Sequence, residues 1–193
     1  MDEKKSKTII AQLIKEERIG TPEQDAEEFF FEKADESLQV AERLLKISQD
    51  KNDSLKSYMW TISVAYYSMF YSATSVLAHF GHRIKTDIGI HKITYHALVY
   101  YFHVLDKKIQ KQLLESYKDV YTDAEQLLQN TEAKAVELME NFKFEQEKRK
   151  TFTYDMGAYA QENKAITSVK RAKEFYTHIE SILKQRGRVF NKK

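Results

Sequence analysis

The sequence has few of the residues that make turns and cross-links, since its 193 residues include one Pro, five Gly and no Cys. A β-sandwich or β-barrel needs a turn about every ten residues, and so few Gly and Pro residues cannot supply those turns. The absence of Cys excludes a disulfide scaffold, a thiolate zinc site and catalysis by a cysteine nucleophile. We therefore expect a compact all-α domain in a reducing, cytoplasmic setting.

Signals for secretion and membrane insertion are also missing. The N-terminus carries only a short apolar patch and no cleavage site of small residues. Residues 58–80 carry no formal charge, and this length could span a bilayer at about 1.5 Å per residue. Ser and Thr recur through the stretch, however, and Tyr66, Tyr67 and Tyr71 lie near its centre instead of at its ends. We interpret the stretch as the buried central helix of a bundle and expect no membrane association.

Charge is plentiful but segregated along the chain, although the formal net charge is only +2. Acidic residues dominate 21–50 and 112–140, whereas basic residues dominate 81–111 and 141–193. If the two basic stretches meet in space, they form a patch that attracts phosphates. The alternative is a set of solvated, Lys-rich helix faces.

Apolar periodicity predicts an antiparallel, up-and-down bundle of about five helices. We expect residues 1–20 to be a partly helical or mobile extension, followed by a single bundle domain over 21–193. Thr21–Gln24 resembles a capping box that begins a helix ending near Gln49, with its apolar stripe at Ala34, Leu38, Ala41 and Leu45. Asp53 or Ser54 then caps the uncharged helix, which ends at Gly81.

The second half of the chain gives weaker boundaries. Thr86 or Asp87 is expected to cap a third helix, and a second capping box at Thr122 predicts a break near that residue. Residues 150–163 lose the helical period and contain Gly157, which predicts a loop. A last helix then runs from about 163 to 186.

The six His residues do not form a strong metal motif. His96 and His103 align on one helix face, but His91 lies about 140° away from His96 and no acid accompanies them. The Glu-x-x-His pairs of di-iron bundles are absent. We expect neither a metal nor another cofactor.

Phosphate-binding glycine loops are absent, so any phosphate must be held by basic side chains and helix ends. His82, Arg83 and Lys85 precede a predicted helix N-terminus, where backbone N–H groups also favour anions. A solvated basic loop is the alternative. Aromatic and basic residues alternate again around Arg149, Lys150 and Tyr154, a pattern that can stack and neutralise single-stranded RNA or fill a core.

One run of residues resembles a known family. The run is Ala65-Tyr-Tyr-Ser-Met-Phe-Tyr-Ser-Ala73, followed by Leu77, Gly81 and Lys85-Thr-Asp-Ile-Gly89. It resembles the A-Y-Y-A-M-F…L…G…K-[ST]-H-x-G pattern of HEPN-domain proteins. Together with the last helices, the resemblance covers about residues 24–186. The resemblance implies a helical bundle, often a homodimer, that binds a nucleotide or RNA. It also implies partnership with a small nucleotidyltransferase in toxin–antitoxin pairs. Several HEPN branches are metal-independent endoribonucleases with an Arg-x(4–6)-His active site at a dimer cleft.

The chain departs from that catalytic pattern. Arg149 has the right spacing, but Tyr154 stands where the family has His, and Asp87 replaces the His that follows Lys-Thr. Tyr ionises near pH 10 and is a poor base at neutral pH. Arg171 and His178 also fit Arg-x(6)-His and share a helix face. An acidic stretch around 115–140 resembles an insertion.

These observations leave several functions open. The leading hypothesis is a HEPN-like domain that binds a nucleotide or RNA, with ribonuclease activity left open. The competing hypothesis is a non-catalytic interaction module that docks a nucleotidyltransferase or another partner through an acidic helix face and an exposed aromatic strip. A third is a small-molecule sensor with a pocket near Tyr67 and Tyr71.

Overall fold

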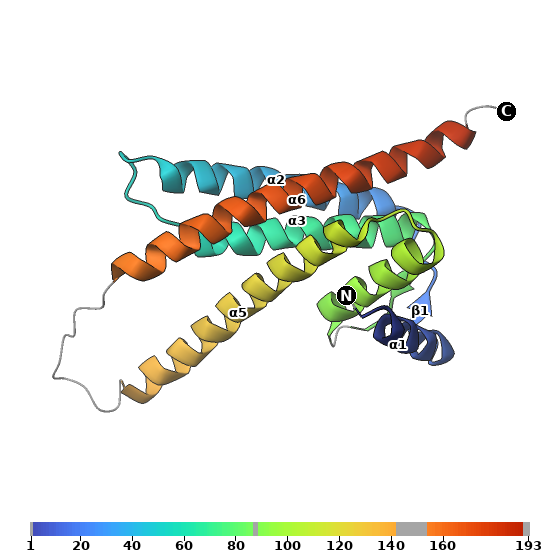
Figure 1. The fold of residues 1–193 in the computed structure, drawn as a ribbon, viewed down its shortest axis with the longest axis horizontal. Coiled ribbons are helices and arrows are strands. Elements are labelled where there is room, and N and C mark those ends of the chain that lie inside the picture. The colour runs from blue at the N-terminus through green and yellow to red at the C-terminus, as the bar shows by residue number, and fades with distance from the viewer. Residues whose placement is uncertain (1, 87–88, 142–153, 191–193) are drawn as a thin grey trace.

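The computed structural model describes the backbone of residues 2–86, 89–141 and 154–190, and the side chains of residues 2–86, 89–127 and 161–184. The described chain forms α1 (Glu3–Lys15), α2 (Ala26–Gln49), α3 (Tyr58–His79), α4 (Ile90–Leu98), the π-helix η1 (Val99–Leu105), α5 (Lys111–Asn141) and α6 (Tyr154–Phe190). Two short strands, β1 (Ile19–Gly20) and β2 (Arg83–Ile84), pair antiparallel. The predicted all-α bundle is therefore confirmed (Figure 1).

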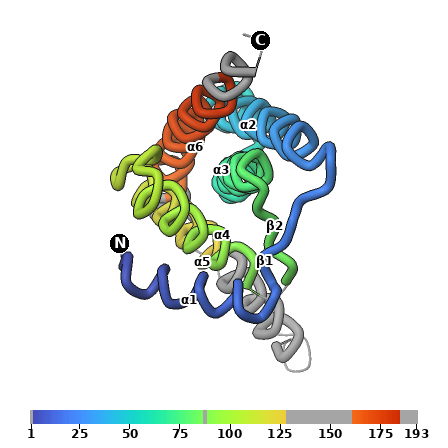
Figure 2. Tube along the Cα trace, turned by 90° about the vertical axis from the view of Figure 1, so that its right-hand side faces the viewer, coloured from blue at the N-terminus to red at the C-terminus, as the bar shows by residue number. Residues whose placement is uncertain are grey.

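The uncharged helix α3 lies at the centre of the bundle. Figure 2 shows α2 and α6 on one side of it and α4 and α5 on the other. Ala65 and Ala73 are fully buried, and such small side chains let neighbouring helices approach closely. The hydroxyls of Ser68 and Ser75 donate to backbone carbonyls of α2 at 2.9 and 2.8 Å, so its polar residues are satisfied inside the bundle. No described helix has the length and apolarity of a membrane span.

The first long helix keeps its predicted apolar stripe but not its predicted start. Ala34, Leu38 and Ala41 are buried, and α2 ends at Gln49 as expected. It begins at Ala26 after Asp25, however, so the Thr21–Gln24 segment lies in the connection from β1 instead of capping a helix. This connection lies on the outside of the bundle beside the β-ribbon (Figure 2).

Two predicted boundaries of the neighbouring helices are also wrong, whereas one is confirmed. Helix α3 begins at Tyr58 after Ser57, not after Asp53 or Ser54. Ser57 is hydrogen-bonded to Ser48 of α2 through its amide and its hydroxyl, which holds the start of α3 at this position. The next helix is preceded by Gly89 in the left-handed conformation, not by Thr86 or Asp87, the latter lying outside the described residues. Gly81 has φ +82° just after α3, which confirms the expected helix stop.

The C-terminal half contains fewer interruptions than the sequence predicts. No break occurs at Thr122, because its hydroxyl donates to the Lys118 carbonyl at 2.9 Å within α5 instead of capping a new helix. Residues 154–163 are helical, so the predicted loop over 150–163 is wrong for that part. Gly157 falls in the first turn of α6, and its cost there is the backbone entropy that glycine loses in any helix.

The N-terminal helix packs against the rest of the molecule. Ile10 is fully buried, Leu13 is nearly so, and α1 lies beside α4 and η1 (Figure 2). The hydroxyl of Ser6 and Nδ1 of His96 lie 2.9 Å apart in this buried contact. Residues 3–15 therefore contribute to the core.

Candidate functional site

A hollow of about 250 Å³ lies where β2, α3, α4 and the start of α2 meet. Its floor is apolar and includes Phe30, Phe70 and Ile90. His82 and Arg83 lie on its lining, as the sequence predicted for an anion-binding segment. The volume is close to the roughly 300 Å³ at the lower end of ligand pockets. A single heterocyclic ring suits the apolar space better than a whole nucleotide with its phosphates.

Local backbone structure fixes the position of the two basic residues. Gly81 turns the chain after α3, and Arg83 then pairs with Gly20 in the β-ribbon. The amide of Lys85 continues this pairing by donating to the Arg18 carbonyl at 2.8 Å. The ribbon therefore holds β2 against the open side of α3 (Figure 2).

Arg83 supplies the cationic group at this site. Its Nη1 atom donates to Oε1 of Glu23 at 2.6 Å, and both side chains are more than half exposed. An exposed ion pair of this kind contributes at most about 1 kcal/mol to stability. Because a guanidinium has five N–H donors, Arg83 can bind an anion at the edge of the hollow while keeping or exchanging this contact.

His82 is held by aromatic stacking. Its ring lies 3.8 Å from the ring of Tyr101, with the planes 18° apart. Tyr101 belongs to the π-helix, and such helices are frequent at functional sites. Burial lowers the pKa of His82, and the charge of Asp106 opposes that shift only in part. His82 is therefore mainly neutral at pH 7 and offers a hydrogen bond instead of a charge.

Thr94 is a polar lining residue that the sequence reasoning missed. Its side chain is almost fully buried, and it lines the hollow. The hydroxyl of Thr74, which also lines the hollow, donates to the Phe70 carbonyl at 2.9 Å. No sequence signal separates Thr94 from an ordinary helix threonine, because only the fold places it against the hollow.

Other residues predicted for phosphate binding do not join this site. The side chain of Lys85 lies over Gly20 on the ribbon and does not line the hollow. Arg149 and Lys150 lie outside the described residues. Tyr154 begins α6, but its side chain is not described. The structure thus brings together His82 and Arg83 from the predicted set.

The predicted Arg171–His178 pair is spread along the surface of α6. Nη2 of Arg171 lies 3.3 Å from a carboxylate oxygen of Asp119, whereas Nε2 of His178 lies 3.0 Å from the Lys108 carbonyl oxygen. Seven helical residues separate them by roughly 10 Å along the axis. The two side chains line different shallow depressions. Within one chain, they do not converge on a common point.

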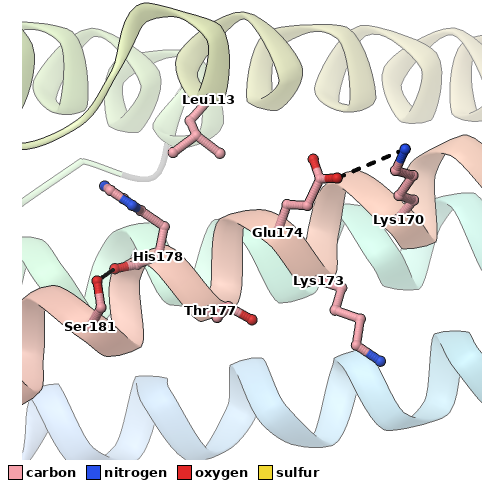
Figure 3. Close-up of a pocket in the computed structure, with 7 residues that line it drawn as sticks. All are labelled: Leu113, Lys170, Lys173, Glu174, Thr177, His178 and Ser181. Atoms are coloured by element: carbon pink, nitrogen blue, oxygen red, sulfur yellow. Dashed lines mark hydrogen bonds and ion pairs between the residues drawn. The ribbon is translucent and has the colours of Figure 1, made fainter.

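Figure 3 shows the depression that contains His178. The neighbouring Lys170 is directed to Glu174, and Lys173 points away from His178 toward α2, where it contacts Glu42 at 2.8 Å. These cations are therefore engaged by carboxylates of the same chain. The depression lacks the concentrated positive charge that RNA binding requires.

The remaining His residues are dispersed among structural contacts. Nδ1 of His91 lies 2.6 Å from the Tyr66 hydroxyl, and His103 contacts the Ile109 carbonyl at 3.0 Å. His79 lies 2.9 Å from Glu27. The described residues contain no group of three side chains placed to hold a metal ion.

The hollow therefore combines an apolar floor, one cationic side chain, a neutral imidazole and a buried hydroxyl. This set of groups can hold a flat ring and an attached anion. Two titratable side chains of the lining are engaged separately, since His82 stacks on Tyr101 and Glu23 pairs with Arg83. Comparison of the chain with protein-family profiles, curated proteins and solved structures finds no match.

Proposed function

We propose that this chain is a HEPN-like domain that binds a nucleotide, either free or at the end of an RNA, in the hollow beside β2. The observation that carries the proposal is the position of His82 and Arg83 beside an apolar floor of suitable size. The A-Y-Y-x-M-F pattern within α3 supports the HEPN-like assignment.

In the proposed mode of binding, the base lies against Phe30 and Phe70. The Thr94 hydroxyl, on an almost fully buried side chain that lines the hollow, donates to or accepts from a polar edge of the base. The phosphate remains outside the apolar space and binds the Arg83 guanidinium. Glu23 competes for the same cation.

Calorimetric titration with nucleoside monophosphates and the matching nucleosides tests this arrangement. We expect Arg83→Ala to weaken monophosphate binding about tenfold and nucleoside binding much less, because the lost interaction is with the phosphate. Lys85→Ala is the matched control, since Lys85 is an exposed base two residues away that does not line the hollow. Glu23→Gln should tighten monophosphate binding by removing the competing carboxylate.

Equal losses in the Arg83 and Lys85 variants would show that phosphate binding, if present, depends on general charge and not on this site. No binding of any nucleotide or of a short single-stranded RNA would contradict the proposal itself. Repeating the RNA titration at two salt concentrations measures how many phosphates are contacted.

A threonine variant tests the hollow apart from its charge. Thr94→Val keeps the side-chain shape and removes the hydroxyl, so we expect the free energy of unfolding of the free protein to change by no more than about 1 kcal/mol. Ligand binding should weaken about tenfold. Thr61→Val is the control, because Thr61 is equally buried but donates to the Ser57 carbonyl at 3.0 Å and should lose about 1 kcal/mol. Unchanged affinity in Thr94→Val would exclude the hydroxyl from the binding mode.

We also propose two protein partners for the HEPN-like domain, namely a second copy of the chain and a small nucleotidyltransferase. In the pair with the nucleotidyltransferase, the chain is the toxin-like member of a toxin–antitoxin pair. Co-purification from the native host tests the nucleotidyltransferase, and recovery of the chain without such an enzyme counts against it.

A further inference from the structure

Exposed apolar side chains gather on one face of the molecule. Nine large apolar side chains are exposed among the described residues, and five of them belong to α2 and α3. We call this surface the α2–α3 apolar face, and its exposed members are Phe29, Val40, Ile47, Trp60 and Tyr67.

Helical spacing and contacts place the α3 members on one side. Neighbouring helices cover the other sides of α3. The Ser68 hydroxyl donates to a backbone carbonyl of α2. The Tyr66 ring centre lies 5.5 Å from that of Tyr121 in α5, and the Phe70 ring centre lies 4.5 Å from that of His91 in α4. Residues 60, 67 and 71 are spaced by seven and four and share the remaining side. Trp60 is 62% exposed, although the sequence predicts it as part of the core.

The α2 members continue the same surface. Phe30 stacks on Tyr71 with ring centres 6.2 Å apart, and Phe29 contacts Phe30 at 5.3 Å, which joins the two helices there. Val40 and Ile47 follow Phe29 at spacings of eleven and seven residues, which return to nearly the same helix face. Figure 1 shows α2 and α3 side by side over most of their lengths.

The size of the face suits an interface. Its five exposed side chains present on the order of 500 Å² of mostly apolar area, since a buried aromatic residue alone covers about 150–250 Å². The largest patch on an ordinary monomer is about 300–600 Å², and many such patches are functional. With a polar rim, the face approaches the roughly 800 Å² that each partner contributes to a standard interface.

Charge on the face favours a second copy over a nucleic acid or a strongly charged peptide. Lys33 and Glu36 lie on the same side of α2 and pair with each other at 2.7 Å, which leaves the face close to neutral. A neutral face can be laid on its own copy without like-charge repulsion, and a two-fold dimer is the commonest oligomer. Arg43 lies three residues after Val40 and four before Ile47, so it adds an exposed positive charge beside the face. A single such charge is few for binding a polyanion.

We infer that two copies of this chain associate through the α2–α3 apolar face, burying Trp60 and Phe29 between them. This inference specifies the surface for the second copy in the proposed function. It can be tested apart from nucleotide binding, because Arg83 is not a member of the face and Val40 does not line the hollow.

Sedimentation equilibrium over a range of protein concentrations tests the inference. We expect a reversible dimer whose dissociation constant rises at least tenfold in Val40→Glu and in Phe29→Glu. Leu105→Glu and Ile166→Glu are matched controls, since these residues are exposed to similar extents on η1 and α6, away from the face. Arg83→Ala should leave dimerisation unchanged, which separates this test from the nucleotide test.

Trp60 provides a second measurement because it is the only tryptophan in the chain. We expect its fluorescence to shift to shorter wavelength and resist quenching by acrylamide as protein concentration increases. A monomer at all concentrations, a dimer equally weakened by the control variants, or Trp60 emission independent of dimer formation would each overturn the inference. Circular dichroism confirms that each variant is folded.

Discussion

At the scale of single residues, His96 links protonation to stability. Its side chain is 5% exposed at the contact between α1 and α4. Burial above all, together with the nearby charges of Lys5 and Lys92 and against the charge of Asp2, lowers its pKa to about 4. In the unfolded chain, the same group has a pKa near 6.5.

This difference predicts that acid destabilises the protein. Because the unfolded state binds the His96 proton more tightly, the contribution is fully present above about pH 6.5 and is lost as pH falls toward 4. Between about pH 7.5 and pH 5, we expect the free energy of unfolding to fall by about 2 kcal/mol from this group. Urea unfolding at the two pH values measures the change.

A variant identifies the responsible residue. His96→Gln should lose stability at neutral pH but remove most of the acid sensitivity, because it has no group that titrates in this range. His178→Gln, at a partly exposed position on α6, is the control and should keep the acid sensitivity of the unmodified protein. The pKa values of His82 and His91 are also lowered by burial, so a smaller dependence of the same sign should remain. Undiminished acid sensitivity in His96→Gln would contradict the assignment.

At the scale of elements, Gly81 ends α3 and directs β2 to the hollow. Its φ of +82° is a conformation that glycine adopts without strain and alanine does not. Space is not the constraint, because an added Cβ would meet no atom within 4 Å. We expect Gly81→Ala to lower the free energy of unfolding by about 1 kcal/mol through backbone strain alone.

Gly20→Ala provides the comparison for this prediction. Its added Cβ would meet the end of the Lys85 side chain, which is flexible and exposed and can move away. We expect a loss below about 0.5 kcal/mol, measured by the same urea titration. If both variants lose the same stability, the left-handed conformation of Gly81 is not the cause.

The elements also show what a sequence can predict. Long apolar stripes identify the bundle, the central helix and the end of α2, because burial requires the same period along the whole element. Boundaries are less predictable, because one polar residue can serve two local structures. Thr122 could cap a new helix, but in α5 its hydroxyl bonds the carbonyl four residues earlier. A sequence pattern alone does not distinguish these two bonds.

At the scale of the molecule, the site depends on contacts between distant segments. His82 and Arg83 could be proposed from their order in the chain, whereas Phe30 and Thr94 join them only after α2 and α4 have packed on α3. Likewise, the helical period suggests a core position for Trp60, but it does not show whether another element covers that residue. Among the described residues, none does. Long-range packing, which the sequence encodes only indirectly, decides both outcomes.

The packing of α1 gives the last prediction. Ile10 is fully buried, whereas Ile14, one turn later on the same helix, is 47% exposed. Removing the Ile10 side chain leaves a cavity in the shared core, so Ile10→Ala should lower the free energy of unfolding by about 2–4 kcal/mol. Ile14→Ala removes the same atoms from a partly solvated position and should cost less than about 1 kcal/mol. Urea unfolding followed by circular dichroism compares the two. Equal small losses would mean that α1 is detached in solution, and in that case deletion of residues 1–17 should leave the stability of the remaining helices unchanged.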